Sequence, residues 1–488
     1  MVQDRWYNVD MTATTPAATA RSTDHRLGFT TQESEIRVDR LPVTGGELPA
    51  WLEGTLVRTG PSKFEVGEQS MRHWFDGLAM LHAFTVRDGR VGYASKFLES
   101  NAYKAARDTG KIAYSEFATD PCRGLFKRVQ AMWSPKLTDN AAVNVTRLGE
   151  RYLSMTELPM AVEFDPHTLD TLNIARVDKE GDGQITTAHP HLDRGSGALV
   201  NQTLKLGPKS EYRVWTRNAD DAERQIVGRL ATKKPAYMHS FGLSDRHVVF
   251  VEGPLVVNPL RLATSGKPFI ENYRWKPELG TKVTLFPLDG SAPIGPLETD
   301  PFFVFHHINA FERDGEIVCD LCAFEDSSIV DSLYLDRLRA AVRIPMSRAK
   351  RLRIPLDGKG AITTEELADT GFELPRIDYR RCNQRPYRYA WGVSADGVWL
   401  DRIVKIDTET GDVRTWSRDG CYPGEPIFVP APGDSAEDEG VLLSVVLDTA
   451  REASSLVVLD ARTLEEVARA EVPHHIPHSF HGQYFGGV

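Results

Sequence analysis

Hydrophobic residues in this chain come mostly in short runs that are separated by turn-forming residues. Clear runs occupy residues 81–86, 247–251 and 440–447, and runs of this length rich in Val, Ile, Leu and Phe predict β-strands. Asp-Gly pairs, which favour hairpin turns, occur at positions 88, 289, 357 and 396. Helical periodicity is scarce, and residues 332–342 form the best helix candidate. The pattern predicts an all-β protein.

A short motif recurs along the chain. An apolar residue is followed by Asp and, three positions after the Asp, by Thr; this occurs at Asp165, Asp407 and Asp460, with a looser copy that lacks the Thr at Asp357. An Asp in this setting caps a turn between two strands. Asp357 and Asp407 are 50 residues apart, and Asp407 and Asp460 are 53 apart, a period typical of propeller blades. The alternative is chance recurrence of Asp turns, which any all-β protein can contain.

Composition narrows the class of protein. The 488 residues are 41% hydrophobic and 26% charged, as in globular proteins, and the length alone suggests about three domains, although propellers break that rule. The net charge is 58 − 68 = −10 without basic blocks, which argues against nucleic-acid binding. Five scattered cysteines indicate a reducing compartment rather than a disulfide framework.

The chain shows no targeting or membrane-spanning segment. No apolar run approaches the roughly 18 residues that a spanning helix needs, and the first residues lack a secretory signal pattern. We therefore expect a cytoplasmic protein. Residues 1–30, which begin with a stretch rich in Thr, Ala, Ser and Pro, are expected to form a flexible tail, and residues 31–488 a single catalytic domain.

Four histidines have distinctive surroundings: His189, His239, His306 and His481. Several neighbours are aromatic or aliphatic, and an imidazole without a partner is costly to bury there. A metal ion would be such a partner; the alternative is a hydrogen bond from each ring to the backbone. The spacings of 50, 67 and 175 residues match no local metal motif, but the inner strands of a propeller would bring distant residues to one axis.

Longer segments carry a family resemblance. Residues 54–61, 73–82, 139–145, 234–242 and 422–429, in this order, resemble the carotenoid cleavage oxygenase family, in particular its animal-type branch of β-carotene-cleaving enzymes and the retinal pigment epithelium isomerase. The resemblance extends over residues 41–485. It implies a seven-bladed β-propeller with a helical and loop cap over a ferrous iron on the propeller axis.

The resemblance also implies the residues of the iron site. It gives His189, His239, His306 and His481 as the four ligands, and Glu157, Glu373 and Glu425 as glutamates that accept a hydrogen bond from three of them. Thr156 is implied to lie beside the iron. Five other histidines near these motifs do not fall on ligand positions: His191, His307, His474, His475 and His478.

This residue set suits oxygen chemistry. Neutral imidazoles leave Fe²⁺ with its full charge and with open positions for O₂, the co-substrate, whereas the common two-His-one-carboxylate site places an anion on the metal. Carboxylates that instead accept the far ring N–H fix the tautomer and direction of each imidazole. From the sequence we expect Glu425→Ala to lower iron occupancy without unfolding the protein.

The expected substrate is a carotenoid or an apocarotenoid, and the expected reaction is dioxygenase cleavage of one polyene C=C bond into two carbonyl products. β-Carotene cut at its central 15,15′ bond to retinal is the first choice and an apocarotenoid the second. The resemblance implies that stilbene-cleaving relatives use a lysine near residues 138–141 to meet a phenolate. This segment contains no lysine, which disfavours stilbene cleavage. Retinoid isomerohydrolase chemistry stays open, and a non-catalytic propeller that serves as a binding platform is the remaining alternative.

Such a substrate dissolves in membranes, so we expect peripheral contact with a membrane surface. Residues 120–133 mix large apolar and basic residues, as interfacial segments do, and residues 255–262 form a second apolar stretch. The alternative for each segment is that it packs on the propeller. No spanning helix is expected.

Overall fold

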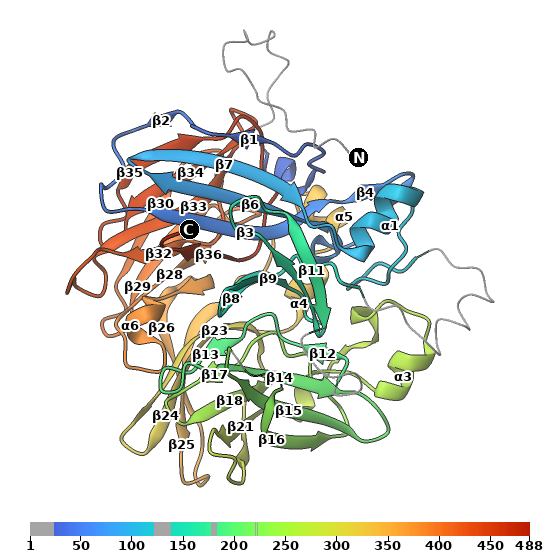
Figure 1. Ribbon diagram of the computed structural model, residues 1–488. Coiled ribbons are helices and arrows are strands. Elements are labelled where there is room, and N and C mark those ends of the chain that lie inside the picture. The colour runs from blue at the N-terminus through green and yellow to red at the C-terminus, as the bar shows by residue number, and fades with distance from the viewer. Residues whose placement is uncertain (1–23, 122–137, 177–182, 220, 222) are drawn as a thin grey trace.

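The computed structural model describes residues 24–121, 138–176, 183–219, 221 and 223–488, and the strands in these ranges form seven sheets of four to six strands. The paired strands within each sheet are antiparallel. Seven antiparallel sheets that follow one another along the chain are the blades of a β-propeller, and Figure 1 shows them with the chain coloured from blue to red. The fold predicted from the sequence is confirmed.

The strands divide among the blades in chain order, except at the two ends of the chain. The first blade contains β1 (Arg37–Val38), β3 (Gly54–Lys63), β6 (Leu78–Arg87), β7 (Arg90–Phe97) and β36 (Gly482–Phe485), the second β8 (Asn144–Leu148), β9 (Arg151–Met155), β10 (Met160–Phe164) and β11 (Thr171–Arg176), and the third β12 (Ile185–Thr186), β13 (His191–Leu192), β14 (Leu199–Lys205), β15 (Ser210–Arg217) and β16 (Gln225–Thr232).

The other four blades follow. The fourth contains β17 (Gly242–Leu243), β18 (His247–Glu252), β21 (Thr281–Pro287) and β22 (Ile294–Thr299), the fifth β23 (Phe303–Arg313), β24 (Glu316–Phe324), β25 (Arg348–Pro355) and β26 (Thr363–Gly371), the sixth β27 (Glu373–Arg376), β28 (Tyr389–Ser394), β29 (Arg402–Asp407) and β30 (Val413–Ser417), and the seventh β2 (Val43–Thr44), β31 (Cys421–Pro423), β32 (Ile427–Pro430), β33 (Gly440–Asp448), β34 (Ala453–Asp460) and β35 (Glu466–Glu471).

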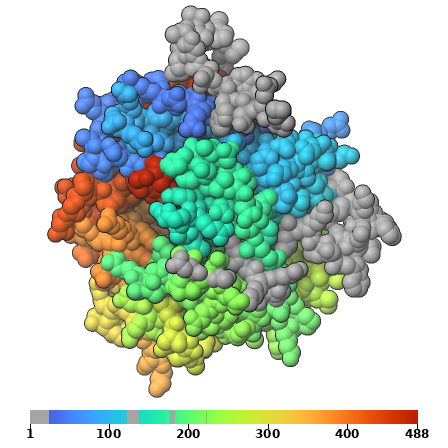
Figure 2. All heavy atoms as spheres, viewed as in Figure 1, coloured from blue at the N-terminus to red at the C-terminus, as the bar shows by residue number. Residues whose placement is uncertain are grey.

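The ring of blades is closed by strands from both ends of the chain. β36 pairs with β3, so the C-terminal strand completes the first blade. β2 pairs with β35 and ties an N-terminal segment to the seventh blade. In Figure 2 the dark red C-terminal residues accordingly emerge between the blue first blade and the teal second blade. Closure leaves no open end where the sheets could separate.

The recurring Asp motif marks the turn between the two outer strands of a blade. The Oδ1 atoms of Asp165, Asp407 and Asp460 each accept hydrogen bonds from the backbone N–H groups two and three residues later, at 2.8–3.3 Å. Asp357 lies between β25 and β26 and accepts from Lys359 N at 2.9 Å. The repeat with a period near 50 residues therefore corresponds to successive blades, as predicted.

Short helices lie between the strands. They are η1 (His25–Phe29), η2 (Trp74–Asp76), α1 (Asn101–Thr109), α3 (Pro259–Thr264), η3 (Ile270–Asn272), η4 (Pro277–Leu279), α4 (Ser328–Ser332), α5 (Leu335–Arg339) and α6 (Tyr379–Cys382), with small hairpins formed by β4 (Glu65–Val66) and β5 (Gln69–Ser70), and by β19 (Leu255–Val256) and β20 (Arg274–Trp275). In the described ranges no helix is long and apolar enough to cross a bilayer.

The helix predicted at residues 332–342 is interrupted. α4 ends at Ser332 and α5 begins at Leu335. The Leu333 carbonyl accepts from Trp74 N at 3.0 Å, and Leu335 N donates to the Arg72 carbonyl at 2.9 Å. These bonds to another segment replace the helical ones, so the predicted helix is confirmed only as α5, and its predicted start is wrong because of tertiary contacts that the local sequence does not reveal.

The expected flexible tail, residues 1–30, is described only from residue 24. Residues 25–29 form η1, and Phe29 is fully buried against the rings of Trp74 and Trp399. His25 Nε2 lies 3.1 Å from the Leu338 carbonyl. The packed part of the chain therefore begins before residue 31, because η1 contributes an aromatic side chain to the largest apolar cluster.

Candidate metal centre

Four histidine side chains from distant parts of the chain meet at one point. The ligand atoms of His189, His239, His306 and His481 all lie within 4.8 Å of one another. His189 Nε2 is 3.1 Å from His239 Nε2, and His306 Nε2 is 3.1 Å from His481 Nε2. Within the described part of the chain, this is the cluster of His, Cys, Asp or Glu residues that could hold a metal ion.

Every blade contributes one residue to this site. The four histidines come from segments at β13, β17, β23 and β36, and thus from the third, fourth, fifth and first blades. Glu157 follows β9 of the second blade, Glu373 begins β27 of the sixth, and Glu425 lies between β31 and β32 of the seventh. The propeller thus brings together histidines whose successive spacings in the sequence are 50, 67 and 175 residues.

A β-bulge directs one of the histidines. The pairing of β23 with β24 matches Val304 with Ala323 and His307 with Leu321, so one extra residue lies on β23 in the interval that contains His306. Such bulges turn a side chain away from the regular alternation and are common next to active sites. His306 consequently points to the axis while its neighbour His307 bonds through Nδ1 to Ser240 Oγ at 2.8 Å.

Three glutamates accept hydrogen bonds from three of the histidines. His239 Nδ1 donates to Glu157 Oε1 at 2.6 Å, His306 Nδ1 to Glu373 Oε2 at 2.6 Å, and His481 Nδ1 to Glu425 Oε1 at 2.7 Å. Each bond places the ring proton on Nδ1 and leaves a lone pair on Nε2.

This arrangement fits a bound cation. His306 and His481 both carry their proton on Nδ1, so their Nε2 lone pairs face each other at 3.1 Å, which is repulsive unless a cation lies between them. A metal with bonds of about 2.1 Å to imidazole nitrogens brings neighbouring nitrogens to about 3 Å. Burial lowers the pKa of His306 well below its usual range and that of His481 to about 4, which keeps both rings neutral, as metal ligation requires.

The three glutamates differ in what else holds them. Glu425 also accepts from Arg376 Nε at 2.9 Å and from Gly482 N at 3.1 Å, and Arg58 lies 3.7 Å away. Burial opposes its ionisation, but Arg376, His481 and Arg58 together hold the pKa of Glu425 well below its usual range. Burial raises the pKa of Glu373 to about 7, and its buried Oε1 atom has no hydrogen-bond partner among the described residues.

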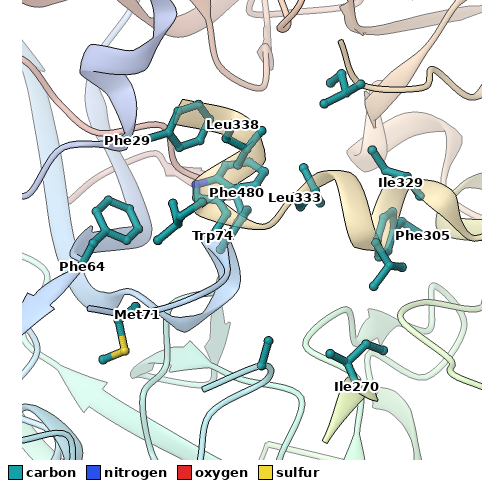
Figure 3. Packing of buried hydrophobic residues seen from close by; sticks show 14 of the residues in the cluster. Phe29, Phe64, Met71, Trp74, Ile270, Phe305, Ile329, Leu333, Leu338 and Phe480 are labelled. Carbon is teal, nitrogen blue, oxygen red and sulfur yellow. The ribbon is translucent and has the colours of Figure 1, made fainter. Parts of the chain in front are cut away.

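A largely apolar cavity of about 570 Å³ opens onto the histidines. His239, His306 and His481 line it together with aromatic residues, among them Trp74, Phe305 and Phe480. Trp74 and Phe480 lie side by side (Figure 3). Their ring centroids are 4.3 Å apart. Cavities of this size and character hold extended apolar ligands.

The structure also places Thr156 and the histidines that were not predicted as ligands. Thr156 lines the cavity next to Glu157. His191 bonds through Nε2 to the Phe241 carbonyl at 3.0 Å, and the other non-ligand histidines likewise lie outside the four-histidine cluster.

The two expected membrane segments have different outcomes. Residues 122–133 of the segment 120–133 lie outside the described residues. In the segment 255–262, Leu255, Val256 and Val257 are buried in the core, whereas Leu260 on α3 is 72% exposed. Apolar runs look alike in sequence whether they pack inside or lie on the surface, so only the α3 part of this segment remains a surface candidate.

The structure adds residues that sequence reasoning missed. Arg58 and Arg376 hold Glu425, and Tyr237 bonds to Glu157. Glu116 lines the cavity, is 7% exposed, and accepts from Thr138 Oγ1 at 2.8 Å. Tyr237 lies two positions before His239 within the segment 234–242, but no local pattern indicates the roles of the arginines or of Glu116.

Glu116 gives a testable pH dependence. Burial raises its pKa from 4.5 to about 8, with the charges of Asp76 and Asp139 adding to the effect, while Thr138 and Asn140 favour the ionised form. The folded protein keeps a proton that the unfolded chain releases above pH 4.5, so this group's contribution to stability falls as the pH rises toward 8. The wild type should therefore lose unfolding free energy between about pH 6 and pH 8. We expect this loss to be smaller in Glu116→Gln, by roughly 2 kcal/mol.

Urea unfolding of the wild type and the variant at both pH values measures this effect. Glutamine keeps an oxygen that can accept from Thr138. An unchanged pH dependence in Glu116→Gln would show that Glu116 is already ionised in the folded protein at neutral pH.

Comparisons with known proteins agree with this geometry. A family model described as retinal pigment epithelial membrane protein matches residues 29–486. The chain is 36% identical to a carotenoid isomerooxygenase of Galleria mellonella over 90% of this chain and 92% of the relative, and 32% identical to the β,β-carotene 15,15′-dioxygenase of Homo sapiens over 93% of each. A crystal structure of cobalt-substituted Synechocystis ACO superposes with a TM-score of 0.85 at 27% identity, covering 95% of this chain and 99% of that one.

Proposed function

The chain belongs to the family of the retinal pigment epithelial membrane protein and the carotenoid oxygenases, and on this basis we propose that it cleaves a polyene C=C bond of a carotenoid with O₂. The observation that carries the proposal is the convergence of four imidazole Nε2 atoms, three of them from histidines that line an apolar cavity. The proposed resident ion is Fe²⁺, held by His189, His239, His306 and His481.

The reaction consumes one C=C bond and one O₂ molecule. The double bond breaks, each of its carbons gains one oxygen atom, and two carbonyl products form without another reductant. Ferrous iron with open coordination positions supplies the activation of O₂. The chain's own residues hold the polyene among aromatic side chains, exclude water, and select the double bond that lies beside the histidines.

The residue roles follow from the contacts. Glu157, Glu373 and Glu425 fix the tautomer of His239, His306 and His481 by accepting the Nδ1–H bond. Thr156, which lines the cavity beside Glu157, narrows the space next to the metal.

The first proposed substrate is β-carotene, cut at its central double bond, because the cavity wall around the histidines is aromatic and aliphatic. An apocarotenoid is the second candidate, and a specific observation favours it. Ser115, Glu116, Thr138 and Asn140 line the same cavity, and Glu116, whose pKa is raised to about 8, is a neutral carboxyl at pH 7. A neutral carboxyl can donate a hydrogen bond to the carbonyl or hydroxyl of a shortened carotenoid.

The experiment incubates the iron-loaded protein with β-carotene, an apocarotenal, a retinyl ester or a stilbene and identifies the products by chromatography. Retinal from β-carotene supports the first candidate, and a shorter dialdehyde from the apocarotenal alone supports the second. Isomerised retinol from the ester would show a retinoid isomerohydrolase, and benzaldehydes from the stilbene would show a stilbene-cleaving enzyme, in place of carotenoid cleavage. Absence of product from all four would overturn the enzyme proposal.

Peripheral membrane contact through α3 is part of the proposal. Pro259, Leu262 and Ala263 of α3 line the cavity, and Leu260 on the same helix is 72% exposed. An exposed leucine on a helix that lines an apolar cavity would let a substrate pass from the bilayer into the cavity without crossing water.

We expect Leu260→Asp to reduce the fraction of protein bound to liposomes about tenfold, since burial of one leucine contributes roughly 1.5–3 kcal/mol. Leu172→Asp is the matched control, because Leu172 is 61% exposed on β11, outside the described lining of the cavity. A flotation assay measures both. Equal binding of the wild type and Leu260→Asp would exclude α3 as the contact.

A further inference from the structure

Tyr237 connects the carboxylate of Glu157 to the aromatic wall of the cavity. Its hydroxyl lies 2.9 Å from Glu157 Oε1 and 3.0 Å from Glu157 Oε2. The same Oε1 accepts the Nδ1–H bond of His239 at 2.6 Å. One tyrosine hydroxyl therefore donates to the carboxylate that orients one of the four histidines.

The Tyr237 ring is fixed by its surroundings. The side chain is 5% exposed and lies nearly parallel to Phe303, with an interplanar angle of 17° and centroids 6.2 Å apart. Tyr273 packs edge-on against the Tyr237 ring, with the ring centroids 5.9 Å apart. The backbone N–H of Tyr237 donates to the Leu255 carbonyl at 2.8 Å. A donor held in this way costs little additional ordering when it binds Glu157.

Besides its histidine, Glu157 is held by a side-chain hydroxyl, whereas Glu373 and Glu425 each accept from a backbone N–H. Glu425 has Arg376 and a backbone N–H besides its histidine, and Glu373 has the backbone N–H of Leu374 at 2.5 Å. Among the described residues, the donors to the Glu157 carboxylate are His239 and Tyr237. Glu157 also lines the cavity, so an open space borders it on one side.

We propose that Tyr237 is a positioning residue of the metal centre, which acts through Glu157 to hold the tautomer and direction of the His239 ring. The Tyr237 hydroxyl faces both oxygens of the Glu157 carboxylate, which can only accept, so the hydroxyl is the donor. Without it, the carboxylate is free to turn toward the cavity and His239 loses a fixed acceptor. The inference rests on the proposed four-histidine iron site and not on the identity of the substrate.

Tyr237→Phe tests the role because it removes the hydroxyl and keeps the ring. We expect iron to bind about 10–100-fold more weakly, the usual cost of losing a partner in the outer shell of a metal site. In the cobalt-substituted protein, the visible ligand-field absorption should shift, a readout that a purely structural role would not change. Tyr273→Phe is the matched control from the same aromatic cluster and should keep both properties.

A double-mutant cycle separates action through Glu157 from an independent effect. If Tyr237 acts through Glu157, the iron affinity of Tyr237→Phe combined with Glu157→Gln should equal that of Glu157→Gln alone within about twofold. Full additivity of the two effects, or an unchanged iron affinity and cobalt spectrum in Tyr237→Phe, would overturn the inference. A wild-type protein that binds no iron would overturn the iron site itself, so the two failures are distinguishable.

Discussion

His306→Ala is expected to abolish stoichiometric iron binding and, with it, the oxygenase reaction. The substitution removes one of four converging Nε2 atoms, which lies 3.1 Å from His481 Nε2, and leaves Glu373 without the donor that it meets at 2.6 Å. The affinity loss should exceed the roughly 10–100-fold that removal of an outer-shell partner costs, because a ligand and its support are lost together.

His307→Ala provides a control at the adjacent position. His307 bonds to Ser240 and lies outside the four-histidine cluster, so the variant should retain one iron per chain. The iron content per chain of both purified variants, measured by metal analysis after dialysis against ferrous iron, tests this assignment. Wild-type iron content in His306→Ala, or its loss in His307→Ala, would show that the histidines are wrongly assigned.

The sequence predicted the fold because its local signals coincide with real boundaries. The Asp motif at Asp165, Asp407 and Asp460 marks the outer turn of three blades, and Asp88 and Gly89 form the tight turn between β6 and β7 with φ angles of 49° and 67°. Such turns depend on two to four consecutive residues, so a single sequence can reveal them. The broken helix at residues 332–342 shows the limit, since distant backbone groups determine where α4 ends.

The site was predictable only as far as the family resemblance reaches. The residues alone left each histidine open to an ordinary core role, and their convergence requires the propeller. The structure brings the four rings and three glutamates together, while their roles as iron ligands and supports stay predictions. Arg58 lies in the segment 54–61 that carries the resemblance, but its role could not be predicted, because it reaches Glu425 from 367 positions away and resembles any other arginine of a strand.

Glu425→Ala is expected to destabilise the protein as well as to weaken iron binding, which revises the sequence-based expectation that it would leave folding intact. Glu425 and Arg58 are each 1% exposed, and Arg376 donates to the same carboxylate at 2.9 Å. Removal of the anion leaves a buried guanidinium without a counter-charge, a change that typically costs about 3–5 kcal/mol. Glu373→Ala should cost far less, because the Glu373 pKa of about 7 shows that its surroundings do not favour the anion.

Denaturant unfolding of the metal-free proteins separates this effect from iron loss. We expect Glu425→Ala to unfold at a clearly lower urea concentration than Glu373→Ala, although both bind iron weakly. Adding Arg58→Met to Glu425→Ala should restore part of the stability, because an apolar side chain of similar length replaces the unpaired cation. If the two alanine variants unfold at the same urea concentration, Arg58 and Arg376 do not depend on Glu425, and its carboxylate serves His481 alone.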